Sequence, residues 1–421
     1  MITKPKGCYD IYGEDAKYYN YINDVFKTVC EYYNYEYIRT PIFEDSELFH
    51  RSVGETSDIV SKETYDFKDR GDRNLTLRPE GTAGVVRSYI ENKMYGEATQ
   101  PKKLYYSGTM YRYERPQAGR FREFSQIGVE VLGSDSPLVD AEVISLAYRL
   151  LEEMGITDLT VKINTLGDKE SREAYRNTLV SYLKPHIHEL CSDCQKRFET
   201  NPLRILDCKV DKDSEILRNA PSIMDSLNEE SKKRFDDVLK YLTLLDVDYE
   251  VDPNIVRGLD YYNHTVFELV SEMDALGTAS TLCAGGRYNN LVSFLGGPDT
   301  PGIGFASGVD RLMMVLKELN KEQRIENNID VYVMAVNDEE SLTALRLVQD
   351  LRWSEIKCDM DTLDKGLKAQ FKQADRLNAR ILIILNSEDL QKGLITVKDN
   401  LTKEETKVDE AEILDYIISN L

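Results

Sequence analysis

The stretch LYYSGTMYRYERPQAGRFREFSQIGVEVL, residues 104–132, decides the fold of the chain. Apolar and polar residues alternate over 104–115 and again over 121–132, and the loop 116–119 between them contains proline and glycine. Two alternating runs joined by such a loop are typical of an antiparallel β-hairpin. We therefore predict a hairpin in which every second side chain lies on the same face of the sheet.

One face of this hairpin combines several groups that suit ligand binding, and four arginines crowd its turn. Arginine can bind phosphate oxygens through two hydrogen bonds, and a phenylalanine ring can stack on a purine. A solvated strand face with Glu–Arg pairs between neighbouring strands is an alternative that the pattern leaves open. The face carries, in order, a cation, an aromatic ring, an amide, a glycine and a carboxylate: Arg122, Phe124, Gln126, Gly128 and Glu130.

The segments around the hairpin alternate between helical and extended patterns. Apolar residues fall on one stripe over residues 14–33 and again near 138–154, which predicts two helices. Residues 169–250 are more charged and mostly helical, so we predict an insertion there. Strand-like sequence resumes at 261–270, and a further helix is predicted over about 309–319.

The C-terminal part follows a different rhythm. After a polar stretch at residues 318–328, predicted strands and helices alternate, and a final helix is predicted near 410–420. This alternation implies an α/β domain with a partly parallel sheet. The alternating elements are strand 329–336, helix 339–353, strand 355–360, helix 363–378 and strand 380–386.

The composition limits the possible classes of protein. The chain has 421 residues, of which 41% are hydrophobic, so sizeable packed cores are expected. Its start lacks the apolar segment of a signal peptide, and its longest aliphatic run, 381–385, is far too short to span a membrane. Seven scattered cysteines favour a reducing, cytoplasmic compartment. Because the formal net charge is −21, an RNA partner would need local basic patches.

Three further stretches contain residue types that suit ligand binding. In LRPEGTA, residues 77–83, Glu80 and Thr82 could bind an ammonium group, although either could instead cap a helix. In RGLDYY, residues 257–262, the arginine could neutralise charge on a phosphoryl group, or it could be an ordinary surface residue. In GIGFASGVDR, residues 302–311, glycines at a helix start would let a ligand contact free backbone N–H groups.

Together these stretches resemble the signatures of histidyl-tRNA synthetases, and the resemblance runs essentially from end to end. Arg39-Thr40-Pro41, Arg112 to Glu130 and Gly302 to Arg311 resemble the three signatures shared by class II synthetases. Residues 257–262 and Ala284-Gly285-Gly286-Arg287-Tyr288 resemble two signatures peculiar to the histidine enzymes. The class I signatures, of the His-Ile-Gly-His and Lys-Met-Ser-Lys-Ser types, do not occur in the chain.

The resemblance implies how ATP would bind. Arg112 and Arg257 would act as the catalytic residues at its α-phosphate, with Arg257 stabilising the pentacoordinate transition state. Arg120 and Arg311 would hold the outer phosphates, which Mg²⁺ would bridge, and Phe124 would stack on the adenine.

The resemblance also implies how histidine would bind. Glu80-Gly81-Thr82 and Gln126 would surround its amino and carboxylate ends. Glu130 and Tyr262 would grip the imidazole, with Tyr261 nearby. Imidazole has a donor and an acceptor nitrogen, so a carboxylate and a phenol can complement it.

We therefore expect a class II synthetase-like α+β catalytic domain over residues 1–320, with a mainly antiparallel sheet and a helical insertion at about 169–250. A linker at 321–328 would lead to an α/β anticodon-binding domain at 329–421. The implied enzyme is a histidine–tRNA ligase, which uses ATP to activate L-histidine and transfers it to the 3′-terminal adenosine of tRNA(His). The resemblance also implies a homodimer with Pro41 at its interface.

The helix predicted at 363–378 supplies a local basic patch. Its apolar residues would pack on the sheet, and they are Leu363, Leu367, Phe371, Ala374 and Leu377. Its cations recur every three or four residues, which suits an RNA contact but also an ordinary solvated helix face. The predicted tRNA-binding residues are Lys365, Lys368, Lys372 and Arg376, followed by Arg380 on the same line, and Gln117, which resembles a position near the acceptor end of the tRNA.

Cys191-x-x-Cys194 together with Cys208 is a partial zinc pattern, for which His186 or His188 could supply a fourth ligand. Three cysteines in a helical segment can equally be reduced, inert thiols. The spacing does not place a fourth ligand, and the resembled family does not require zinc. We therefore assign no metal-binding residues from the sequence.

Three other functions compete with the ligase. A synthetase-like regulatory subunit of ATP phosphoribosyltransferase would bind histidine as a sensor, but such chains typically lack the C-terminal domain and erode the two histidine signatures. A class II synthetase for threonine or proline would share the C-terminal fold, and Glu130 with residues 257–262 argues against it. A purely structural RNA-binding protein would leave the convergent arginines unexplained.

Overall fold

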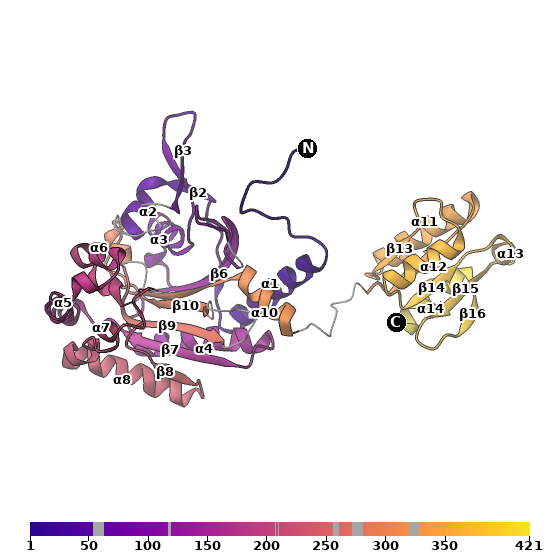
Figure 1. Cartoon of the computed structure of the whole chain (residues 1–421). Helices are drawn as coiled ribbons and strands as arrows, with labels where there is room; N and C mark the ends of the chain where they lie inside the picture. The colour runs from indigo at the N-terminus through magenta and orange to yellow at the C-terminus, as the bar shows by residue number, and fades with distance from the viewer. Residues whose placement is uncertain are drawn as a thin grey trace. The chain divides into compact units, whose positions relative to one another are not determined.

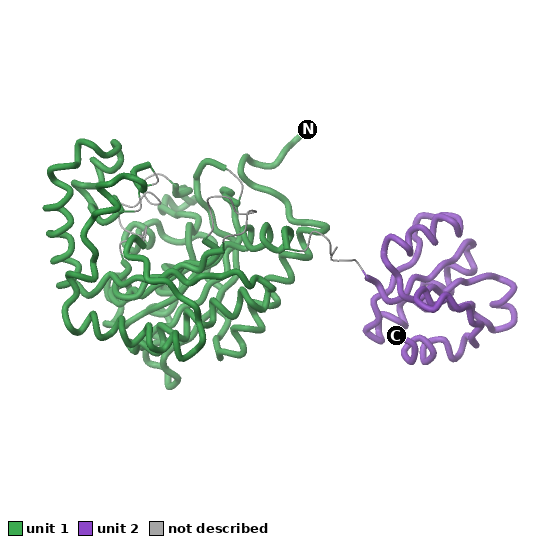
Figure 2. The backbone as a smooth tube through the Cα atoms, turned by 60° about the horizontal axis from the view of Figure 1, so that its bottom comes forward, with its two compact units in different colours: residues 1–321 green, residues 322–421 purple. Residues whose placement is uncertain are grey.

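The computed structural model describes residues 1–53, 63–116, 119–206, 208, 210–255, 261–271, 281–319 and 328–421. The chain divides into two compact units, Met1–Lys321 and Glu322–Leu421 (Figure 2). Each unit is built around a sheet of its own (Figure 1).

An eight-stranded sheet forms the centre of the first unit. Its six middle strands pair antiparallel with one another, and each short edge strand pairs parallel with its neighbour. The mainly antiparallel sheet predicted from the sequence is therefore confirmed. In spatial order the strands are β1 (Glu36–Tyr37), β5 (Lys102–Tyr111), β6 (Glu123–Leu132), β11 (Gly302–Gly308), β10 (Thr281–Arg287), β9 (Asn263–Ser271), β7 (Leu159–Thr165) and β8 (Tyr249–Val251).

The predicted hairpin is the pair β5–β6, in which Lys102 lies opposite Leu132 and Tyr111 lies opposite Glu123. The ladder ends at Tyr111 and Glu123, earlier than the alternation suggests, and the Arg112 N–H still donates to the Arg122 carbonyl over 2.9 Å beyond it. The Tyr111 N–H donates to the Arg78 carbonyl, and the Arg122 N–H donates to the Gly7 carbonyl. Neighbouring segments therefore hold both ends of the arginine-rich turn.

Helices cover this sheet, and the first unit also contains a small second sheet. The helix α1 buries an apolar stripe of Tyr18, Ile22, Phe26, Val29 and Cys30. The described helices of the first unit outside the insertion are α1 (Glu14–Tyr32), α2 (Ser46–Val53), α3 (Thr82–Glu91), η2 (Met94–Gly96), α4 (Pro137–Glu153), α9 (Leu291–Phe294) and α10 (Val309–Leu319). The small antiparallel sheet consists, in order, of β2 (Phe43–Asp45), β4 (Asn74–Leu77) and β3 (Tyr65–Lys68).

The segment between β7 and β8 is helical and has a core of its own. That core includes Tyr175, Leu179, Leu183 and Ile205. Figure 1 shows α5, α6 and α7 gathered beside the central sheet, and α8 packs against α4. The elements are α5 (Lys169–Leu183), η3 (Ile187–Glu189), α6 (Ser192–Thr200), η4 (Pro202–Ile205), α7 (Glu215–Arg218), η5 (Ile223–Ser226) and α8 (Glu229–Leu244).

The glycine-rich segment 302–311 differs from its prediction. Residues 302–308 form β11 in the middle of the sheet, and the helix begins only at Val309. Gly304 lies opposite Glu130 of β6, where an ideal Cβ would come within 2.0 Å of Glu130 Oε2 and 2.2 Å of the Val129 carbonyl oxygen. Gly304 therefore makes room for a buried side chain, and it does not start a helix.

The second unit is the predicted α/β domain. Its sheet has the order β13-β12-β14-β15-β16, parallel from β13 to β14 and antiparallel beyond. No helix in the described part of either unit is long and apolar enough to cross a membrane. The elements are β12 (Val331–Met334), α11 (Asp338–Trp353), β13 (Cys358–Met360), α12 (Leu367–Arg376), β14 (Ile381–Ile384), α13 (Ser387–Leu390), β15 (Leu394–Asp399), β16 (Glu405–Asp409), η7 (Glu410–Glu412) and α14 (Ile413–Asn420).

The close approach at Gly304 gives a stability prediction. Gly304→Ala should lower the free energy of unfolding by about 1–3 kcal/mol, because the new methyl group collides with a carboxylate and a backbone oxygen. Gly308→Ala in the same strand is the matched control, since nothing lies within 4 Å of its ideal Cβ. Scanning calorimetry should show a lower transition temperature for the first variant only, and equal transitions would contradict the packing described here.

Candidate active site

A cavity of about 430 Å³ opens over β6, β10, β11 and the hairpin loop. It brings together most of the described residues that the sequence singled out, although they come from separate segments of the chain. The predicted residues that line it are Glu80, Thr82, Arg112, Arg120, Phe124, Gln126, Tyr261, Tyr262 and Arg311. Arg257 and Gln117 lie outside the described residues.

Three guanidinium groups make one side of the cavity cationic. The Arg112 Nε donates to the Pro79 carbonyl over 2.9 Å, and Arg311 donates to the Thr281 carbonyl. Arg120 Nη1 lies 3.5 Å from Glu114 Oε2. Burial, followed by the charge of Arg120, lowers the pKa of Arg311. The mutual repulsion of Arg120 and Arg311 favours a bound anion near them, and phosphate is an anion that arginine binds well.

An aromatic plate adjoins this cationic side. The guanidinium carbon of Arg112 lies 5.2 Å from the centroid of the Phe124 ring, which fits a cation–π contact. Phe124 is half-buried and lines the cavity, so part of its ring stays available for stacking. A nucleotide could therefore place its base and its phosphates on neighbouring groups.

Glu130 lies behind the cavity wall and has only 1% of its surface exposed. The Thr82 hydroxyl lies 2.7 Å from its Oε1, the Tyr106 hydroxyl lies 3.5 Å from the same atom, and the Tyr288 hydroxyl bonds to its Oε2. Burial raises the pKa of Glu130 to about 8, although the hydrogen bonds from Tyr288 and Thr82 oppose the rise. Glu130 therefore holds the side chains of Thr82, Tyr106 and Tyr288 in place, and it does not itself line the cavity.

The segment 80–82 has a structural role as well as a place in the cavity. The Glu80 carboxylate accepts the backbone N–H groups of Thr82 at 2.7 Å and Ala83 at 2.8 Å, so it caps the start of α3 from the residue before the N-cap Gly81 and not from the first turn. Burial raises the pKa of Glu80. Gly81 does not line the cavity; an ideal Cβ there would come within 2.3 Å of the Tyr106 ring.

Two buried acceptor atoms in the cavity wall have no hydrogen-bond partner within the described part of the chain. They are Gln126 Oε1 and Asp310 Oδ1. Asp310 Oδ2 accepts the Ser125 N–H over 3.0 Å, and burial raises the pKa of Asp310 to about 6. Buried polar atoms in a wall are usually satisfied, so these two suit hydrogen-bond donors of a ligand.

Several of these residues escaped the sequence analysis. Tyr288 ends the quoted stretch 284–288, but the sequence pattern did not indicate its hydrogen bond to Glu130. Tyr106 is one of two adjacent tyrosines in β5, and the pattern did not show which one faces the cavity wall. Gly128 lies opposite Tyr106 in the β5–β6 pair, and an ideal Cβ there would come within 2.5 Å of the Tyr106 hydroxyl, a relation that appears only once the strands are paired.

Comparison with known proteins shows the family of the chain. The family model described as histidyl-tRNA synthetase matches residues 7–312, and the anticodon binding domain model matches residues 330–420. The chain belongs to the histidyl-tRNA synthetase family.

Similar proteins cover the chain from end to end. A histidine–tRNA ligase of Bacillus cytotoxicus is 53% identical over 420 residues, which are 100% of this chain and 99% of that protein. A histidine–tRNA ligase of Anoxybacillus flavithermus is 53% identical and covers 96% of both chains. The crystal structure of apo histidyl-tRNA synthetase from S. aureus has a TM-score of 0.84 and 43% identity, covering 99% of this chain and 100% of that one.

Arg287, in the stretch 284–288 that resembles a family signature, lies in a buried ionic network. It has 0% exposure, and its Nε lies 2.8 Å from Asp140 Oδ1 in α4. Arg234 of α8 lies 3.3 Å from the other oxygen of Asp140. Desolvation raises the pKa of Asp140 while Arg287 and Arg234 oppose the rise. This network links the last residue of β10 to α4 and to the helical insertion.

Two other parts of this family member carry predicted contacts. Pro41 and the neighbouring Ile42 and Phe43 are exposed in the single chain. Lys368, Lys372 and Arg376 are exposed on the basic helix, as an RNA contact requires.

The predicted basic helix begins later than expected. Lys365 precedes α12, and its backbone N–H donates to Asp361 Oδ2 over 2.7 Å, so a turn replaces the first helical turn. Leu363 and Leu367 are 68% and 36% exposed, and the prediction that they pack on the sheet is wrong. Ala374 is buried against the sheet, with Phe371 half-buried beside it, as predicted.

The pKa of Glu130 predicts how stability changes with pH. In the folded state the Glu130 carboxyl group keeps its proton up to about pH 8, whereas in the unfolded state it loses the proton near pH 4.5. The stability that Glu130 contributes is therefore present below pH 4.5 and lost as pH rises toward 8, by at most ~1.4 kcal/mol per pH unit. Glu130→Gln should flatten this decline in urea unfolding experiments between pH 5 and 8. Identical slopes for the variant and the wild type would refute the shift.

Proposed function

We propose that the chain charges tRNA(His) with histidine in two steps at the cavity described above. In the first step a carboxylate oxygen of histidine attacks the α-phosphorus of ATP, forms histidyl-adenylate and expels pyrophosphate. In the second step the terminal ribose hydroxyl of the tRNA attacks the acyl carbon, and AMP leaves. The observation that carries the proposal is one cavity lined by three arginines, an aromatic plate and hydrogen-bonding groups of amino-acid size.

The nucleotide end of the cavity is the arginine side. We assign the α-phosphate to Arg112, the outer phosphates to Arg120 and Arg311, and the adenine to Phe124. Arg257, which is assigned by the family signature alone, would stabilise charge on the pentacoordinate phosphorus. The reaction needs no covalent intermediate with the enzyme, so catalysis rests on positioning and charge stabilisation.

Mg²⁺ belongs to this proposal as a partner of ATP. It usually binds through one or two carboxylates together with substrate phosphates. The Glu114 carboxylate lines the cavity beside Arg120 and is available for that role. When bound, the ion would neutralise charge on the outer phosphates.

The histidine end of the cavity is the tyrosine side. The unpartnered Gln126 Oε1 and the Glu80 carboxylate suit the ammonium group of the amino acid. Tyr262 lines the cavity and would bind one imidazole nitrogen, with Tyr261 beside it. Glu130, which does not line the cavity, would bind the other nitrogen once the Thr82 hydroxyl gives up its bond to Oε1. A site with buried polar partners should reject side chains that cannot form hydrogen bonds in return.

The tRNA would use both units. We propose that the anticodon contacts the second unit, where Lys368, Lys372 and Arg376 are exposed, with Lys365 beside them and Gln117 near the acceptor end. We also propose a homodimer that covers the exposed Pro41 segment, and a cytoplasmic location.

A regulatory, histidine-sensing protein is the main alternative. The match to an anticodon binding domain argues against it, because a sensor has no need to bind tRNA. Histidine-dependent exchange of pyrophosphate into ATP would separate the two, since a sensor binds histidine without activating it. Other amino acids should support no exchange, which also tests the choice among class II enzymes.

The proposed α-phosphate contact predicts a large loss of activity. Arg112→Ala should lower histidine-dependent ATP–pyrophosphate exchange by about a hundredfold to a thousandfold, because it removes a charge that stabilises the transition state. Arg115→Ala is the matched control, since Arg115 is exposed in the same loop and does not line the cavity. Exchange at the wild-type rate in a folded Arg112→Ala protein would remove the assigned role.

The basic helix predicts a separate effect on tRNA. Lys372→Ala should raise the KM for tRNA and lower the salt dependence of tRNA binding by about one unit of slope, while amino-acid activation stays unchanged. Lys392→Ala, an exposed lysine elsewhere in the same unit, should change neither. An unchanged salt slope for Lys372→Ala would exclude this lysine from the RNA contact.

A further inference from the structure

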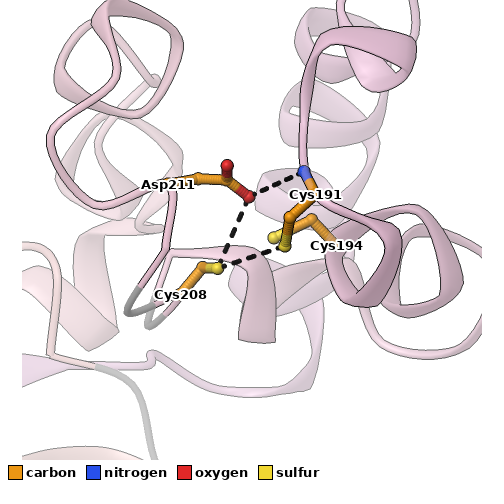
Figure 3. Close-up of side chains that lie close together, drawn as sticks. All are labelled: Cys191, Cys194, Cys208 and Asp211. Atoms are coloured by element: carbon orange, nitrogen blue, oxygen red, sulfur yellow. Dashed lines mark hydrogen bonds between the residues drawn. The ribbon is translucent and has the colours of Figure 1, made fainter.

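Away from the active-site cavity, four potential metal ligands converge in the helical insertion (Figure 3). Cys191, Cys194, Cys208 and Asp211 each offer one ligand atom, and these atoms all lie within 4.8 Å of one another. The sulfur atoms of Cys191 and Cys208 are 3.6 Å apart, and Asp211 Oδ2 lies 3.4 Å from the Cys208 sulfur. Within the described residues, this is the one group of three or more such side chains.

We propose that these four side chains bind a zinc ion, with three thiolates and one carboxylate oxygen as ligands. A zinc–sulfur bond is about 2.3 Å long, so two sulfurs of a tetrahedral site lie about 3.8 Å apart. The Cys191–Cys208 separation of 3.6 Å is close to that edge length. The side chains already point toward one another, and little movement is needed to surround an ion.

The ligand types select the metal. Thiolates are soft ligands that favour zinc, whereas magnesium and calcium require mainly oxygen ligands. A carboxylate oxygen is an accepted fourth ligand of zinc. Cys191 is the N-cap of α6 and Cys194 lies in its first turn, where the helix dipole favours the negative charge that thiolates bring to a metal.

The burial of the group indicates a structural site. Cys194 and Cys208 are buried, and both belong to the hydrophobic core of the insertion together with Leu190 and Ile205. Four protein ligands leave no open position for a substrate, as in structural zinc sites. The ion would fasten the start of α6 to Cys208 and Asp211, which follow η4 in the chain.

This core also reaches the active site. Tyr262, which lines the cavity, packs partly against the same cluster of apolar residues. Loss of the ion should therefore loosen the insertion and weaken histidine binding indirectly.

The fourth ligand differs from the sequence expectation. His186 and His188 were the residues considered for it, and neither belongs to the group. His186 Nδ1 instead lies 2.9 Å from Glu189 Oε1 at the surface. Asp211 lies three residues beyond Cys208, and its carboxylate accepts the Cys191 backbone N–H over 3.0 Å, which holds the loop against the helix start.

The test begins with metal content. Untagged full-length protein, purified without chelator, should contain close to one equivalent of zinc per chain, as measured by inductively coupled plasma mass spectrometry. Cys208→Ser should lose most of it, and Asp211→Asn should weaken retention during dialysis against a chelator. Cys358→Ser is the matched control, because Cys358 is buried in the second unit and its sulfur contacts only the Val348 carbonyl among the described hydrogen-bond acceptors.

A second measurement covers the case in which a cysteine variant fails to fold. Wild-type protein stripped of metal under reducing conditions should bind Co²⁺ and develop the sulfur-to-cobalt absorption bands of a tetrahedral thiolate site. Zinc should displace the cobalt and raise the temperature of thermal unfolding. Wild-type protein that contains no zinc and takes up neither metal would overturn the proposal. A Cys191–Cys208 disulfide in protein isolated from a reducing cytoplasm would overturn it as well.

Discussion

The buried carboxyl group of Glu130 connects segments that are far apart in the chain. Hydroxyl groups of Thr82, Tyr106 and Tyr288 bond to it, and Gly304 has no side chain because the carboxyl group occupies that space. These hydrogen bonds fix the start of α3 against strands β5, β6, β11 and β10, because a buried carboxyl group needs all of its partners in place. The cavity wall therefore has its shape before any ligand arrives.

The antiparallel sheet and a second ionic network place the other groups. Pairing of β5 with β6 carries Phe124 and Gln126 toward the cavity. Pairing of β6 with β11 places Arg311, at the start of α10, near enough to Arg120 for their charges to interact. Arg287 and Asp140 are buried as a hydrogen-bonded pair, and removing one partner would leave an uncompensated charge. Arg287 thus holds β10 to α4, and it does not line the cavity.

Most of the fold followed from the sequence because its elements have strong local patterns. The β5–β6 hairpin alternates clearly, and the helices over 14–32 and 137–153 carry continuous apolar stripes. The start of α12 did not follow, because Asp361 stabilises a turn that overrides an otherwise helical pattern. The glycines of β11 were misassigned since their role depends on a side chain of another strand.

The site was only partly predictable for the same reason. Individual ligand residues stood out through their types and through resemblance to a family, whereas their partners depend on packing. Tyr106, and Asp310 with its unpartnered Oδ1, lack a local pattern that marks them. Asp211 became a candidate ligand only when the fold placed it beside three cysteines.

A crystal structure with a non-hydrolysable analogue of histidyl-adenylate tests the central claim most directly. We expect its adenine on Phe124, its phosphate mimic against Arg112, and its imidazole between Tyr262 and Glu130. An analogue bound elsewhere, or one whose imidazole points to solvent with Glu130 still buried behind Thr82, would contradict the account.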